Sequence, residues 1–255
     1  MRPTIVGIIV FACTFGGVLL GMWLQKTLPG HHLDTESKDA VKVGIGLIAM
    51  MTALVLGLIT ASAKNSYDDV NSGVKKTAVD ILVFDRLLAR YGSETAEIRK
   101  DFQRMLGARI DTIWPQGSSK PANLDPTVSG AGTEAEGLEG AIRALKPRDD
   151  SQRALQSRAL DMTEVLLQAR WLVLAAIQPS VPVPFLVILL FWLTITFASF
   201  GLFAPRNAMV LTVFFVCALS VSLAVFLVLE MDSPFDGLLK VSAEPMRYAY
   251  AHLNQ

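Results

Sequence analysis

Two adjacent histidines, His31 and His32, have the side-chain types in this sequence that best suit a metal ion. The carboxylates of Asp34, Glu36 and Asp39 follow them, and imidazole and carboxylate groups together bind zinc and related metals. Adjacent side chains point apart on regular structure, and no second histidine motif accompanies this pair. We therefore expect no metal site, with His31 and His32 as weak candidates, and assign the carboxylates to the positive N-terminal end of a following helix.

A second group of oxygen ligands consists of Glu230, Asp232 and Asp236, which lie around Pro234. Divalent cations bind carboxylate oxygens, but the spacing of a full calcium-binding loop is absent from this segment. We favour a capped turn at the membrane interface, in which Glu230 or Asp232 pairs with a lysine or an arginine, over cation binding.

The sequence contains none of the motifs that mark common active sites. It has no Gly-x-Ser-x-Gly elbow, no Walker loop, no His-Glu-x-x-His pair and no Cys-x-x-Cys. The two cysteines, Cys13 and Cys217, lie in apolar stretches, where thiols behave as small hydrophobic groups. We expect no enzymatic activity, no catalytic residue and no cofactor.

The distribution of charged residues along the chain predicts which segments are transmembrane helices. Of the 255 residues, 52% are hydrophobic and 18% are charged, whereas soluble domains have about 25% charged residues. Four uncharged stretches of 20 to 22 residues, namely 5–24, 43–63, 184–203 and 208–229, can cross a hydrocarbon core of about 30 Å as helices. The sequence therefore predicts four transmembrane helices in a lipid bilayer. A soluble enzyme is excluded, and a net charge of zero excludes a nucleic-acid binder with a basic face.

The four spans form two hairpins. We expect a first hairpin over residues 1–63, an insert over 64–182, a second hairpin over 183–230 and a tail over 231–255. With four spans, both termini and the insert lie on one side of the membrane. Seven basic residues lie near the spans on that side and four on the other, which favours a cytoplasmic insert and cytoplasmic termini in a bacterial inner membrane.

The insert is predicted to be a helical bundle. In its first part, apolar or semi-apolar residues alternate at spacings of three and four, as in a helix packed along another helix. These residues are Tyr67, Val70, Val74, Thr77, Ile81, Phe84 and Leu88. No proline separates them from the second span, so we expect one long continuous helix. Further helices are expected over 98–113, 134–145 and about 150–176, with a loop at 115–133. No strand pattern is visible, and the predicted fold class is an all-α integral membrane protein.

The second span is the segment best suited to ion conduction. Small residues repeat along it at Ala49, Ala53, Gly57 and Ala61, which lets helix backbones approach closely. They serve either packing within the first hairpin or a subunit contact and pore lining. The pore-lining candidates are Gly46, Ala49, Thr52, Ala53, Gly57 and Thr60, in which the two hydroxyls can meet water or an ion. No ionisable residue lies in mid-membrane, which disfavours a proton-coupled transporter and leaves a passive conduit.

Arg206 lies in a very short turn between two uncharged spans, where Asn207 can cap the next helix. Its guanidinium either reaches lipid headgroups, or pairs with Glu36 or Asp39 of the other loop. Alternatively, it lines the outer mouth of a pore and raises the local anion concentration. Glu36, Lys38 and Arg206 are therefore the outer-mouth candidates.

Four segments carry a family resemblance. They are residues 36–39 leading into Gly44-x-Gly46-Leu47, residues 58–64, residues 197–207 with the run Phe-Gly-Leu-Phe-Ala-Pro-Arg-Asn, and residues 229–237 with Pro-Phe-Asp-Gly. Through them, nearly the whole chain resembles the bestrophin-like domain family of bacterial membrane proteins.

The resemblance to bestrophins implies an architecture. Bestrophins are pentameric, mainly anion-selective channels with two membrane hairpins around a cytosolic helical region, and their second span lines the pore. This sequence has neither their recurring aromatic constriction nor their dense acidic calcium clasp. The implied function is a homo-oligomeric channel for small inorganic ions. The alternative, from another class, is a membrane-anchored interaction or regulatory protein whose helical bundle docks a soluble partner.

Overall fold

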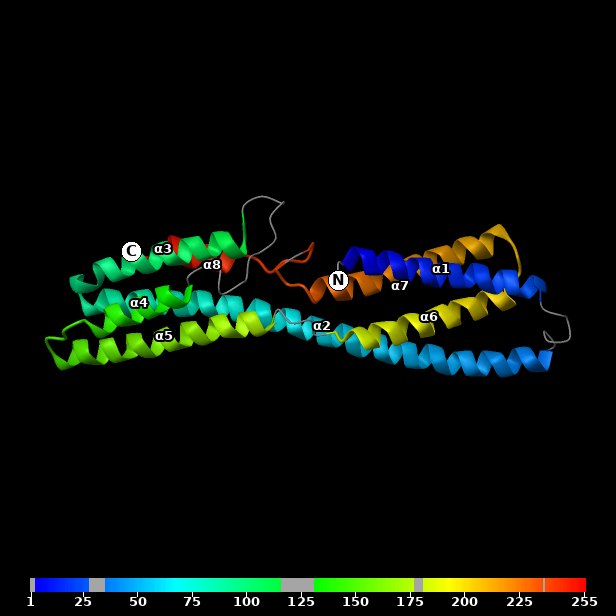
Figure 1. Ribbon diagram of the computed structural model, residues 1–255, viewed down its shortest axis with the longest axis horizontal. Coiled ribbons are helices and arrows are strands. Elements are labelled where there is room, and N and C mark those ends of the chain that lie inside the picture. The colour runs from blue at the N-terminus through cyan, green and yellow to red at the C-terminus, as the bar shows by residue number, and fades with distance from the viewer. Residues whose placement is uncertain (1–2, 28–34, 116–130, 177–180, 236) are drawn as a thin grey trace. The chain divides into compact units, whose positions relative to one another are not determined.

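The computed structural model describes residues 3–27, 35–115, 131–176, 181–235 and 237–255, without the side chains of 35–38, 40, 131–135 and 173–176. The described residues form eight α-helices, one 3₁₀-helix and no strand (Figure 1). The α-helices are α1 (Pro3–Thr27), α2 (Thr35–Tyr91), α3 (Ala96–Ile113), α4 (Ala131–Arg143), α5 (Asp150–Ala176), α6 (Val183–Phe203), α7 (Ala208–Met231) and α8 (Glu244–Ala251), and the 3₁₀-helix is η2 (Ser93–Thr95). The predicted all-α fold class is confirmed.

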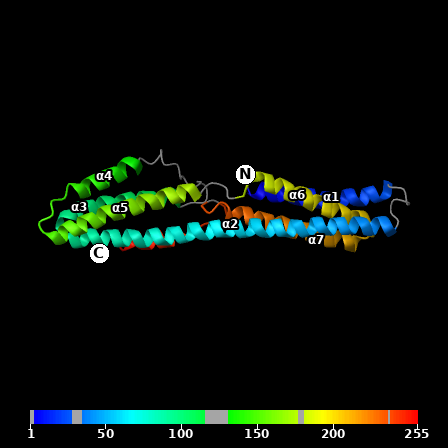
Figure 2. The same ribbon diagram turned by 90° about the horizontal axis from the view of Figure 1, so that it is seen from below.

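Four of these helices are long and apolar enough to cross a membrane. They are α1, α6, α7 and the apolar part of α2. Their positions agree with the four uncharged stretches of the sequence, so the chain is a multi-pass membrane protein. The second span continues beyond its apolar part without a break, since α2 has 57 residues (Figure 2). The expected single long helix is therefore present.

The chain divides into two compact units. Unit 1 consists of Met1–Ser66 and Pro179–Asp232, and unit 2 consists of Tyr67–Gln178 and Ser233–Gln255. These boundaries lie within a few residues of the expected ends of the insert. The residues after 232 belong to the same unit as the insert, because they add apolar side chains to the core of that unit.

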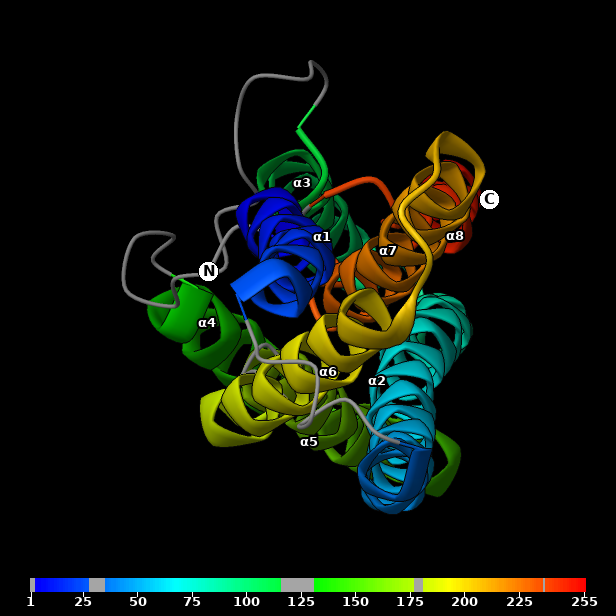
Figure 3. The same cartoon turned by 90° about the vertical axis from the view of Figure 1, so that its right-hand side faces the viewer.

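Unit 1 is built around the packing of α1 on α6 and α7. Seen along the helices, α6 lies beside both α1 and α2 (Figure 3). Its core contains Val18 of α1, Phe197 of α6, Val225 of α7 and Ile59 of α2. The hydroxyl of Ser222 on α7 donates to the carbonyl of Gly7 on α1 at 2.6 Å, a bond made away from water.

Unit 2 buries the alternating seam of α2 as predicted. Val70, Val74, Ile81, Phe84 and Leu88 are at most 4% exposed. They pack against the apolar residues of α3, and the rings of Phe84 and Phe102 meet edge to face with centroids 4.8 Å apart. The third side of this core comes from α4 and α5, and α8 covers α3 with Met246 and Ala249. No pattern in the sequence predicted α8.

The helix ends follow local rules. Asn207 caps α7, since its Oδ1 accepts from the backbone N–H of Val210 at 2.8 Å, and Asp149 caps α5 in the same way through Gln152 at 2.7 Å. The cap by Asn207 was expected. After α2 the chain turns at Gly92, whose φ of 139° is open to glycine and strained for other residues. The helix expected at 134–145 starts earlier, at Ala131.

Candidate functional site

The apolar part of α2 has three faces. One face packs within unit 1 and buries Ile45, Thr52, Ile59 and Ala63. A second face exposes large apolar side chains, those of Leu47, Met51, Leu54 and Leu58, each more than half exposed. The third face, which we call the small face, is exposed and carries Gly46, Ala53, Gly57, Thr60 and Ala61. One large side chain shares it, that of Met50, which is 73% exposed and lies between Gly46 and Ala53. Large apolar side chains suit lipid, so the small face is the one that differs from an ordinary lipid-facing surface.

The small face has open space beside it. A Cβ atom added to Gly46 or Gly57 would meet no atom within 4 Å. A shallow groove of about 600 Å³ runs along this face from Ala53 to Asn65. Such a surface allows either the backbone of another helix or a file of water and ions to come close.

The glycines of α1 are used differently. Added Cβ atoms at Gly17 and Gly21 would lie 2.9 Å from the carbonyl oxygen of Thr194 and 1.9 Å from that of Ala198, both on α6. Gly17 and Gly21 of the first span therefore pack on α6 and not on the small residues of α2. The small face of α2 remains open for a contact outside the chain.

Two of the six pore-lining candidates do not share this face. Thr52 is 6% exposed, and its hydroxyl donates to the carbonyl of Ile48 at 2.7 Å. Ala49 is half-buried between the packed face and the small face. The hydroxyl of Thr60 donates to the carbonyl of Leu56 at 2.7 Å, so its exposed oxygen is left as an acceptor. The structure thus brings the other four candidates together on one exposed face.

Arg206 binds the end of α1. Its Nε donates to Oε1 of Gln25 at 3.2 Å, and its Nη2 donates to the carbonyl of Met22. A cation suits this position because the last carbonyls of a helix carry partial negative charge. The carboxylate of Asp39, an expected partner of Arg206, pairs with Lys42 at 3.1 Å. The side chains of the other two outer-mouth candidates, Glu36 and Lys38, lie outside the described residues.

The described residues contain no group of three or more His, Cys, Asp or Glu side chains that could hold a metal ion. The candidates His31, His32 and Asp236 lie outside the described part of the chain. Glu230 is buried at 4% exposure, and Asp232 is the C-cap residue that directly follows α7. Neither of these two carboxylates is without a partner.

A buried ion pair joins α2 and α3 in unit 2, and the sequence analysis did not find it. Nε and Nη2 of Arg99 donate to Oδ1 and Oδ2 of Asp85 at 2.7 and 2.8 Å, and the side chain of Asp85 is 1% exposed. The hydrogen bond with Asp85 raises the pKa of Arg99. The backbone N–H of Asn254 reaches the same carboxylate at 3.4 Å. The only sequence signal was an acid directly after Phe84 in an apolar seam.

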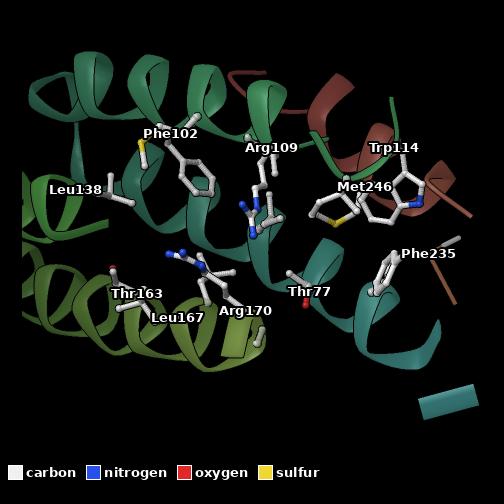
Figure 4. A pocket seen from close by; sticks show the side chains of 17 residues that line it. Thr77, Phe102, Arg109, Trp114, Leu138, Thr163, Leu167, Arg170, Phe235 and Met246 are labelled. Atoms are coloured by element: carbon white, nitrogen blue, oxygen red, sulfur yellow. The ribbon is translucent and has the colours of Figure 1, made fainter. Parts of the chain in front are cut away.

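Unit 2 also contains a cavity of about 210 Å³, partly open to the surface, that the sequence did not reveal. Most of its wall is apolar, with Phe102, Leu138, Leu167 and other side chains from α2 to α5, together with Phe235 and Met246. Arg109 of α3 and Arg170 of α5 extend from opposite walls into the same space (Figure 4). Each arginine directly neighbours an apolar seam residue in the sequence, which was the available signal.

Comparison with known proteins shows which family the chain belongs to. No curated protein and no solved structure matches the chain. The bestrophin-like domain, however, matches residues 12–246, a range that begins in the first span and ends in α8. It includes the larger part of the first span, the other three spans and the whole insert, as the resemblance of the short segments had implied. The chain therefore belongs to the bestrophin-like domain family.

Proposed function

We propose that this protein is a homo-oligomeric ion channel whose conduction path runs along the small face of α2. The observation that carries the proposal is the open groove beside Ala53, Gly57 and Thr60, on a helix whose other faces are packed or carry large apolar side chains. A row of small residues in the bilayer leaves room for a water-filled path when several copies of the helix surround an axis.

The family supplies further support. By resemblance to bestrophins, we propose five subunits around the axis and small inorganic anions as permeants. From the excess of basic residues near the termini and the insert, we propose that unit 2 and both termini are cytoplasmic and that the membrane is the bacterial inner membrane. Passive conduction needs no ionisable group in mid-membrane, and the four uncharged stretches contain none.

Reconstitution with matched variants tests this function. Liposomes containing the purified chain should release chloride, and native mass spectrometry in mild detergent should show an oligomer. Gly57→Phe places a ring on the small face and should block the flux, whereas Leu54→Phe changes the lipid-like face, where the native side chain is 64% exposed, and should conduct.

Oligomer size is measured for both variants, so that a blocked path is separated from failed assembly. A monomeric wild-type chain that gives no chloride flux would remove the proposed function. Equal flux through oligomers of the two variants would remove the small face from the path.

A further inference from the structure

The cavity of unit 2 is poorly suited to water. Its volume of 210 Å³ would hold about seven water molecules at roughly 30 Å³ each. Ordered water in such a space needs two to four polar partners. Because the wall is mostly apolar, an apolar ligand fills this space with less loss of hydrogen bonding than water does.

The polar groups at the cavity indicate which chemical group a bound ligand would carry at one end. Arg109 and Arg170 bring two positive charges from facing helices into one partly apolar space (Figure 4). Each takes part in an interaction within the chain, but a guanidinium has five N–H donors and can hold a second partner. Two guanidiniums on either side of one site match an anion, and a carboxylate accepts their donors in pairs.

The hydroxyls at the cavity do not compete for this role. Thr77 donates to the carbonyl of Gly73 and Thr163 to that of Ala159, both at 2.9 Å. Their protons are therefore used within their own helices, and their oxygens act as acceptors. A carboxylate, which only accepts, is bound by the arginines and not by these threonines.

We propose that the cavity binds a small amphipathic carboxylate, with the apolar body among Phe102, Leu138 and Leu167 and the carboxylate between Arg109 and Arg170. A dry apolar cavity of roughly 150 Å³ holds benzene, so this cavity of 210 Å³ accommodates an apolar chain of about seven carbons. Octanoate is the matching probe. The site uses no residue of the small face of α2 and is independent of whether the chain conducts ions.

Equilibrium dialysis of labelled octanoate against the full chain in lipid nanodiscs measures this binding directly. Empty nanodiscs give the uptake by lipid. The chain should add saturable binding of one octanoate per subunit, and octanol, which has the same body without the charge, should show no saturable binding. This comparison uses the wild-type protein alone and does not depend on how any variant folds.

Variants then locate the site. Arg109→Gln and Arg170→Gln should each weaken octanoate binding about tenfold or more, because each removes charge-assisted hydrogen bonds. Arg104→Gln on α3 and Arg158→Gln on α5 change exposed arginines of the same helices and should bind as the wild type does. Ala169→Phe, at the cavity wall, should abolish binding by filling the space.

Three results would overturn the proposal. The first is uptake no greater than that of empty nanodiscs, and the second is equal saturable binding of octanol. The third is octanoate binding that survives both arginine substitutions and Ala169→Phe.

Discussion

Gly21 of α1 and Ala198 of α6 lie so close that a Cβ atom on the glycine would be 1.9 Å from the alanine carbonyl oxygen. The reverse relationship holds one step along the same interface, where a Cβ atom on Gly201 would be 2.2 Å from the carbonyl of Val18. The two backbones therefore touch, and the position of α6 depends on glycine at both places.

Gly21→Ala should consequently destabilise unit 1. The added methyl group meets backbone, which cannot move aside as a flexible side chain can, and overpacking of this kind costs about 1–3 kcal/mol. Gly16→Ala is the matched control on the same helix, since nothing lies within 4 Å of its added Cβ. Thermal unfolding in detergent should show a lower midpoint for Gly21→Ala only. Equal midpoints for both variants would contradict the close contact.

The buried pair of Asp85 and Arg99 should contribute strongly to the integrity of unit 2. Asp85→Ala leaves the Arg99 guanidinium, with a side chain 15% exposed, without its bidentate partner, and loss of one member of a buried pair costs about 3–5 kcal/mol. Asp101→Ala breaks an exposed pair with Arg104 on the same helix as Arg99 and should cost less than about 1 kcal/mol. Unfolding midpoints followed by circular dichroism check the difference, and a similar small loss in both variants would argue against a structural role of Asp85.

Because Tyr91 is buried, we expect the protein to lose stability at alkaline pH. It is 4% exposed, its hydroxyl has no hydrogen-bond partner among the described residues, and burial, followed by the charge of Glu94, raises its pKa above 10.0. A raised pKa in the folded state means that the folded chain keeps this proton to a higher pH than the unfolded chain does. The contribution of Tyr91 to the free energy of unfolding is therefore fully present below about pH 10 and is lost as the pH rises toward the folded pKa.

Tyr91→Phe removes that titration and leaves no buried hydroxyl unsatisfied. At pH 7 its free energy of unfolding should stay within about 1 kcal/mol of the wild type or exceed it. Between pH 9 and pH 11, in the range of about one unit on each side of the free pKa, its midpoint should fall less than that of the wild type. Tyr250→Phe, at an exposed tyrosine, is the control and should follow the wild type. Parallel pH profiles of Tyr91→Phe and the wild type would exclude the raised pKa.

The membrane part of the fold was predictable because its signal is local. Uncharged stretches of about 20 residues are rare in the helices of soluble proteins, and the seam from Val70 to Leu88 continues the same helix without a proline. The helices that pack on the small residues were not predictable, because a glycine permits a close approach but does not specify which helix approaches. Gly21, for example, packs on α6.

The elements missed by the sequence analysis depend on contacts between distant residues. α8 has 8 residues, too short for a periodic pattern, and is held by burial of Met246 and Ala249 against α3. Asp85 and Arg99 meet only because the turn at Gly92 folds α3 back along α2. The cavity arises from the packing of several helices, and no single segment carries its signature.

The side of the membrane on which unit 2 lies follows from the charge bias and can be measured. Single cysteines are introduced at Thr27, at the end of α1, and at Ser157, on the exposed surface of α5, in a chain in which Cys13 and Cys217 are replaced by alanine. In intact cells, a membrane-impermeant thiol reagent should label the cysteine at position 27 and not the one at 157. The opposite labelling pattern would reverse the proposed topology.

The most direct test of the conduction path uses the same cysteine-free chain in liposomes, with a charged, water-soluble methanethiosulfonate reagent. Gly57→Cys places a thiol in the open space of the small face, and Leu58→Cys places one on the neighbouring lipid-like face, where the leucine is 63% exposed. Only a thiol in contact with water ionises and reacts. We predict that the reagent reduces chloride flux through Gly57→Cys and leaves flux through Leu58→Cys unchanged. Inhibition at Leu58→Cys alone, or full flux through a conducting Gly57→Cys after treatment, would contradict a path along this face of α2.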